Sequence, residues 1–113
     1  FFDSIEIAQA ALVRFRAFPG IETVQGAPDN VEVTAQGVDK GTALLALADM
    51  LGIPREATLA IGDSDNDRAI LARAGVAAVM ANALPEIRAL GDIVSTCDND
   101  HDGVAELFER LGL

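Results

Sequence analysis

The sequence has little positive charge, almost no cysteine and no long apolar run. Eight basic residues stand against 18 acidic ones, which gives a formal net charge of −10 and argues against nucleic acid or an anionic membrane as the main partner. The single cysteine, Cys97, cannot form an internal disulfide, so we expect a reducing compartment and a cytoplasmic location. The longest apolar run, residues 74–81, is far shorter than a membrane-spanning helix.

The composition that is present suits one compact domain. Half of the 113 residues are apolar, which is enough for a single hydrophobic core in a chain of this length. With so acidic a balance, small molecules or cations are the better candidates for ligands.

The pattern of apolar residues changes near residue 36. Before it, the pattern predicts a helix over residues 6–18 and short strands at 21–24 and 31–33, which is an α+β arrangement. After it, helices and strands alternate, with helices at 42–51, 66–74, 85–90 and 104–111 and strands at 58–61, 76–80 and 93–94. This alternation predicts an α/β fold with parallel strands, whose ligands bind at the carboxyl ends of the strands. We expect the leucine and alanine stripe of residues 44–51 to lie in the core.

The segment "IGDSDNDRAI", residues 61–70, places three carboxylates directly after a predicted strand. Asp63, Asp65 and Asp67 repel one another there unless a cation or hydrogen-bond donors compensate. A divalent metal would do so. Because octahedral Mg²⁺ takes only one or two protein carboxylates, Asp63, nearest the strand, is the expected direct ligand. The alternative is that Asp65 or Asn66 only caps the following helix while the other carboxylates face water.

The only lysine, Lys40, lies at the start of the predicted helix over residues 42–51. The positive end of the helix dipole disfavours a cation at this place. Together with the helix N–H groups, the lysine ammonium would form a phosphate site. The alternative is a solvated surface lysine, partly offset by the neighbouring Asp39.

Three stretches of the sequence belong together: "GVDKGTALLALADMLGI" (37–53), "TLAIGDSDNDRAILARAGVAAVMANA" (58–83) and "DIVSTCDNDHDGVAELFERL" (92–111). In their order and spacing they resemble the C-terminal part of Cof-type phosphatases of the haloacid dehalogenase-like superfamily. The resemblance implies that residues 37–113 form the C-terminal half of a Rossmann-like parallel-sheet core. It also implies that residues 1–36 are the C-terminal remnant of an α+β cap domain.

The same resemblance implies a Mg²⁺-dependent hydrolysis of phosphomonoesters through an aspartyl-phosphate, on a small metabolite such as a sugar phosphate. Lys40 would neutralise the nucleophile and the phosphate, and Asp63 would ligate Mg²⁺. Asp67 would hold the water shell of the metal or Lys40. Asn66 would meet the phosphate, and Asn82 would line the same edge of the sheet as a substrate contact.

The nucleophile of this family lies in a "DxDGT"-like motif, which these 113 residues do not contain. The nearest candidate is Asp3 in "FFDSIEI", but Ile5 takes the place of the acid that would protonate the leaving group. We therefore expect the C-terminal portion of a longer phosphatase, inactive alone. A truncated sheet would expose an edge and an apolar face, which favours association with another copy or with a missing N-terminal portion.

A second acidic stretch, residues 98–109, fits the EF-hand pattern D-x-D-x-D-G-x₅-E. The residues before Asp98 predict a strand rather than the entering helix that an EF-hand needs, and no second hand is present to pair with it. We expect a loop that leads into the last helix, with His101 solvated and Cys97 a small packed thiol. Calcium binding is the alternative.

Two other classes of protein compete with the phosphatase interpretation. A phosphoacceptor receiver domain also combines aspartates with a lysine on a parallel sheet, but its acids precede its lysine, whereas Lys40 precedes Asp63 here. A non-catalytic cation-binding or interaction module, derived from a phosphatase half, is the second alternative. Metal binding without hydrolysis would identify such a module.

Overall fold

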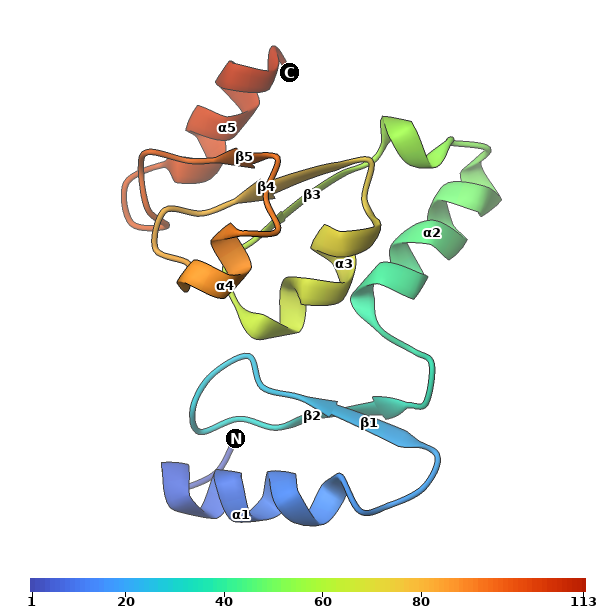
Figure 1. Ribbon diagram of the computed structural model, residues 1–113, viewed down its shortest axis with the longest axis vertical. Helices are drawn as coiled ribbons and strands as arrows, with labels where there is room; N and C mark the ends of the chain where they lie inside the picture. Colours follow the sequence, from blue (N-terminus) through green and yellow to red (C-terminus); the bar gives the residue numbers. More distant parts are fainter. The chain divides into compact units, whose positions relative to one another are not determined.

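A computed structural model describes all 113 residues and divides the chain into two units, Phe1–Asp39 and Lys40–Leu113 (Figure 1). The first unit contains one helix and a hairpin, and the second contains a sheet with helices on both of its faces. No helix has the length and apolar character that crossing a membrane requires.

The first unit has the α+β arrangement expected from its sequence. Helix α1 (Ile5–Phe15) is capped by the preceding Ser4, whose Oγ accepts a hydrogen bond from the backbone N–H of Ile7 at 3.3 Å. The antiparallel strands β1 (Ile21–Val24) and β2 (Glu32–Ala35) follow. Gln25 closes the loop between these strands by donating to the carbonyl of Asn30 at 3.2 Å.

The second unit confirms the predicted α/β alternation. Helices and strands follow in the order α2 (Lys40–Leu51), η1 (Arg55–Ala57), β3 (Leu59–Gly62), η2 (Asp65–Asp67), α3 (Arg68–Arg73), β4 (Val76–Val79), α4 (Pro85–Arg88), β5 (Ile93–Val94) and α5 (Gly103–Leu111). The three strands form one parallel sheet in the order β3-β4-β5. Because the strands are parallel, their carboxyl ends meet at one edge of the sheet, where the acidic loop begins.

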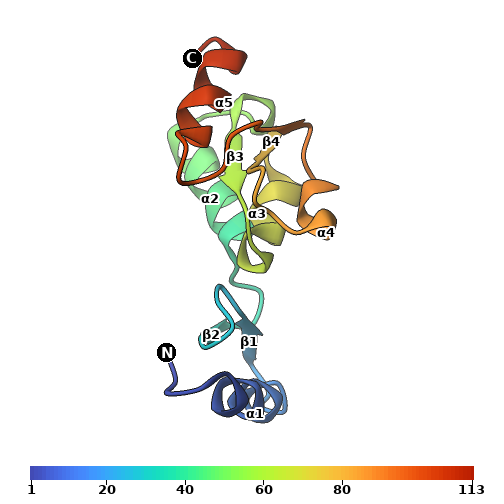
Figure 2. The ribbon, with the colours of Figure 1, turned by 90° about the vertical axis from the view of Figure 1, so that its left-hand side faces the viewer.

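The central strand β4 is buried on both faces, and its residues alternate between two apolar clusters. Ala77 and Val79 pack with Leu71 of α3 and Ile87 of α4. Ala78 and the following Met80 pack with Leu107 of α5 on the opposite face. Figure 1 shows α5 on one side of the sheet and α3 and α4 on the other; Figure 2 shows the same unit from the side. Small alanines in the strands let the helices approach closely.

The prediction that the stripe over residues 44–51 lies in the core is wrong for two of its leucines. Ala48 is buried and Leu44 packs on the core, but Leu47 and Leu51 are 55% and 64% exposed. Helix α2 packs on α3 through Gly41, where a Cβ would collide with the backbone carbonyl of Ala69. The contact face therefore runs through positions 41, 44 and 48, and positions 47 and 51 lie on the neighbouring face of the helix.

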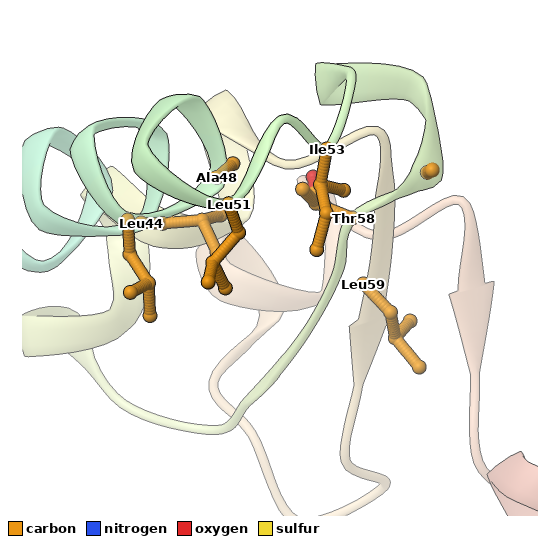
Figure 3. Close-up of a pocket in the computed structure, with 8 residues that line it drawn as sticks. Leu44, Ala48, Leu51, Ile53, Thr58 and Leu59 are labelled. Carbon is orange, nitrogen blue, oxygen red and sulfur yellow. The ribbon is translucent and has the colours of Figure 1, made fainter.

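Leu47 and Leu51 line an apolar pocket between α2 and the start of β3 (Figure 3). Its other lining residues include Leu44, Ile53 and Leu59. The polar side chain in this lining, Thr58, donates to the carbonyl of Arg55 and accepts from the N–H of Gly75. Because the pocket lies at the amino end of β3 and offers no charge, it is not where the carboxylates gather.

Candidate functional site

The loop that follows β3 is closed by the carboxylate of Asp67. Its Oδ2 accepts hydrogen bonds from the backbone N–H groups of Asp63 at 3.1 Å and Ser64 at 3.3 Å. Gly62 makes this closure possible, because a Cβ at that position would lie 2.5 Å from the Cβ of Asp67. One carboxylate thus satisfies two donors at the end of the strand, which offsets much of the repulsion expected among the three aspartates.

The second oxygen of Asp67 holds Lys40. The Lys40 Nζ lies 2.7 Å from Oδ1 of Asp67, whose side chain is only 13% exposed. Burial raises the pKa of Asp67, but the Lys40 ammonium and the N–H groups of Asp63 and Ser64 together lower that pKa below its ordinary value. The carboxylate therefore stays ionised at neutral pH and fixes the only lysine beside the acidic loop.

Asp63 is held from the other side by Asn82, which follows β4. The Asn82 Nδ2 donates to Oδ2 of Asp63 at 3.1 Å, and Asn82 Oδ1 accepts from the backbone N–H of Asn99 at 3.2 Å. Oδ1 of Asp63 has no protein partner. The structure thus brings Lys40, Asp63, Asp67 and Asn82 together at one edge of the sheet, and the roles of these residues toward a metal or a substrate stay predictions.

The oxygen atoms at this edge of the sheet suit a Mg²⁺ ion that takes a single direct ligand from these residues. No group of three histidine, cysteine or acidic side chains converges anywhere in the 113 residues, so the protein alone builds no closed metal cage. Asp63 offers one unoccupied carboxylate oxygen, and Mg²⁺ commonly keeps its waters and takes further oxygens from a phosphate. Both oxygens of Asp67 already accept from protein donors, and a role for Asp67 toward the metal stays a prediction.

The alternative that Asp65 or Asn66 caps the helix after the acidic loop is wrong, because other residues occupy the cap positions. Ser64 precedes the 3₁₀ turn η2 and Asp67 precedes α3, so neither Asp65 nor Asn66 is a helix cap. Asp65 pairs instead with Arg68 at 3.0 Å, and Oδ1 of Asn66 accepts from the Ser64 hydroxyl at 2.7 Å. The predicted contact of Asn66 with phosphate stays a prediction.

Asp3, the nearest candidate for a nucleophile in the sequence, is exposed in the first unit, ahead of α1.

The EF-hand-like stretch forms a turn that is closed by its own side chains. Oδ1 of Asp98 accepts from the backbone N–H of Asp100 at 3.0 Å and contacts Nδ1 of His101 at 2.5 Å. The bond to His101 and the N–H of Asp100 hold the pKa of Asp98 below its ordinary value, against a smaller opposing effect of desolvation. His101 is exposed, as expected. No group of three histidine, cysteine or acidic side chains converges in this loop, so the structure gives no support to calcium binding there.

Glu106 is a structural carboxylate that the sequence analysis missed. Its side chain, on α5, accepts hydrogen bonds from the backbone N–H groups of Thr96 and Cys97 at 2.8 and 2.9 Å. The guanidinium of Arg110 forms an ion pair with the same carboxylate at 3.0 Å. The N–H of Cys97 is the main cause that lowers the pKa of Glu106 to about 2. The i,i+4 spacing of Glu106 and Arg110 was visible in the sequence, but the loop that Glu106 binds was not.

Comparisons with known proteins show what the chain is similar to. A family model described as haloacid dehalogenase-like hydrolase matches residues 2–108. Phosphatase YwpJ of Bacillus subtilis (strain 168) is 38% identical over 106 residues, which cover 94% of this chain and 37% of that protein.

Solved structures share the fold. A haloacid dehalogenase-like hydrolase from B. subtilis superposes with a TM-score of 0.86 at 36% identity, over 98% of this chain and 39% of that one. The sugar phosphatase BT4131, of subclass IIB, superposes with a TM-score of 0.82 at 26% identity, over 92% of this chain and 40% of that one. The 113 residues therefore span about two fifths of the length of the relatives that they match.

Proposed function

The chain belongs to the haloacid dehalogenase-like hydrolase family, and on this premise we propose that it carries the lysine and the metal-binding aspartate of a Mg²⁺-dependent phosphomonoester hydrolase. The observation that carries the proposal is the cluster at the carboxyl ends of β3 and β4. In it, one partly buried carboxylate, that of Asp67, holds a lysine at 2.7 Å and closes the loop that presents Asp63. A cation and a proposed metal ligand, both linked to Asp67, suit a dianionic phosphate group.

In the proposed reaction, an aspartate from outside these residues attacks the phosphorus of the monoester. The P–O bond to the leaving group breaks, and an acid from the same outside segment gives its proton to the departing oxygen, which leaves as the alcohol. Water then attacks the phosphorus of the aspartyl-phosphate, which releases inorganic phosphate and restores the aspartate. Lys40, oriented by Asp67, neutralises the charge of the nucleophile and of the phosphate oxygens. Mg²⁺ bound at Asp63 would balance further phosphate charge and orient the phosphate oxygens. The 113 residues alone would not turn over substrate.

The proposed substrate is a small phosphorylated metabolite such as a sugar phosphate. The name of the sugar phosphatase BT4131, which shares the fold, supports this class. The net charge of −10 supports neither nucleic acid nor an anionic membrane as a partner. We also propose a cytoplasmic location, which the single cysteine supports. Strand β3 is an edge strand of the described sheet, which supports association with a segment that supplies the nucleophile or with another copy.

The test is phosphate release by the polypeptide as its natural source makes it, with p-nitrophenyl phosphate as a general substrate. Lys40→Met and Asp63→Asn are each expected to lower kcat/KM by about 10²- to 10³-fold, because each removes a charge that the transition state needs. Asp3→Asn is the control and is expected to keep wild-type activity.

Loss of activity in Asp3→Asn with retention in Lys40→Met would contradict the proposed roles and would favour Asp3 as the nucleophile. Mg²⁺ binding by the natural polypeptide without any hydrolysis would favour the non-catalytic module.

A further inference from the structure

The side-chain amide of Asn82 links the expected metal ligand to the loop before α5. It donates to Oδ2 of Asp63 at 3.1 Å and accepts from the backbone N–H of Asn99 at 3.2 Å. We propose that Asn82 is a positioning residue, which holds Oδ2 of Asp63 and leaves Oδ1 as the oxygen that binds the cation. The inference rests on the proposed function, because it concerns the same metal site.

The chemistry of its two partners fixes the orientation of this amide. A backbone N–H can only donate, so the oxygen of Asn82 must face Asn99. An ionised carboxylate can only accept, so the NH₂ group must face Asp63. A flipped amide would place two donors against each other at one end and two acceptors at the other. Asn82 therefore acts as a directional link, and no other rotamer of its amide satisfies both partners.

The donor at Asn99 is itself held in place by the loop around it. The Glu106 carboxylate accepts the N–H groups of Thr96 and Cys97, and the Asp98 carboxylate accepts the N–H of Asp100. The side chain of Asn99 donates to Asp100 at 3.2 Å and not to Asn82. The link to Asp63 thus depends on the backbone of Asn99 rather than on its side chain.

The structure also explains why one hydrogen bond to Asp63 matters. Asp63 is half-buried at the end of β3, and Asn82 is the only side chain that bonds its carboxylate. A ligand with a free choice of rotamers must lose that freedom when the ion binds. Partners that orient metal ligands typically change metal affinity by about 10- to 100-fold when they are removed.

The test is a Mg²⁺ titration of the polypeptide as its natural source makes it, followed by the ¹H–¹⁵N NMR signals of the acidic loop and of the Asn82 side-chain amide. Wild type is expected to show saturable shifts at Asp63 and Ser64, and Asp63→Ala is expected to lose them. Asn82→Ala is expected to raise the Mg²⁺ dissociation constant by about 10-fold or more. Asn82 is exposed, so this variant should keep the signals of β4 and α5 unchanged.

Two variants of Asn99 separate the backbone contact from the side chain. Asn99→Ala keeps the backbone N–H and is expected to bind Mg²⁺ as wild type does. Asn99→Pro removes this N–H and is expected to weaken binding as Asn82→Ala does. Without any metal, Asp63→Ala should also shift the Asn82 NH₂ protons, since they lose their carboxylate acceptor.

The outcomes distinguish this inference from the proposed function. Wild-type Mg²⁺ affinity in Asn82→Ala, together with lost binding in Asp63→Ala, would overturn the role of Asn82 and leave the metal site in place. Wild-type spectra that do not respond to Mg²⁺ would overturn both the metal site and the inference.

Discussion

At the scale of single residues, Asp67 is the side chain on which the site depends. Its carboxylate joins Lys40 to the end of β3, and it can do so only because Gly62 leaves room for its Cβ. Asp67 is therefore best described as the residue that assembles the loop, while the proposed contacts with a ligand belong to Asp63 and Lys40.

The close approach at Gly62 leads to a prediction about stability. Gly62→Ala should lower the free energy of unfolding by about 1–3 kcal/mol, because the added methyl group would force Asp67 away from the strand end. Urea unfolding measures the change. A free energy of unfolding within about 0.5 kcal/mol of wild type would show that the loop accommodates the methyl group.

The pH dependence of stability should follow Glu106. Its pKa is lowered from the ordinary value of 4.5 to about 2, so the folded state favours the ionised form. The stability that Glu106 contributes is present above its unfolded pKa and is lost as the pH falls from about 4.5 to about 2. Urea unfolding across this range should show a smaller decline in Glu106→Gln than in wild type. An equal decline in both would contradict the assignment.

The sequence predicted which side chains lie together at the edge of the sheet better than it predicted their hydrogen bonds. Lys40, Asp63 and Asp67 were recognisable because their types and order match a known pattern, and the parallel strands place them at one edge. The bond from Asn82 to Asp63 joins residues from two loops, and the bonds of Glu106 reach a loop nine or ten residues away. Such contacts depend on the tertiary packing, which periodicity does not describe.

At the scale of helices and strands, the alternation after residue 36 was predicted correctly and the details of two helices were not. The helix expected over residues 66–74 begins instead as the 3₁₀ turn η2 and becomes α3 only at Arg68. The bonds of Asp67 back to the strand end tighten this first turn, and a hydrophobic pattern cannot reveal them. In α2, the periodicity identified the apolar residues but not which of two apolar faces would be covered.

The two environments of leucine predict different costs for the same substitution. Leu71→Ala should destabilise the protein by about 2–5 kcal/mol, because Leu71 is 2% exposed in the core. Leu47→Ala should cost about 1 kcal/mol or less, because that side chain is half exposed on α2. Urea unfolding of both variants measures the difference, and equal losses would mean that the exposed face of α2 is covered in solution.

At the scale of the whole molecule, the chain combines a small parallel sheet with the lysine and the aspartate for which we propose roles in phosphoryl transfer. The family match extends over residues 2–108, while the chain spans about two fifths of the length of its relatives. The identity of the first unit as the remnant of a cap domain stays a prediction, and the cap is the part from which substrate choice in this family is expected to come.

The most direct test of the central claim compares phosphate release from a sugar phosphate by two preparations, the 113-residue chain and the polypeptide as its natural source makes it. Each is assayed with Mg²⁺ and with a chelator. The account predicts Mg²⁺-dependent release by the natural polypeptide and none by the 113 residues alone, because these supply the lysine and the metal ligand but not the nucleophile. Turnover by the 113-residue chain, or turnover by the natural polypeptide that survives the chelator, would contradict it.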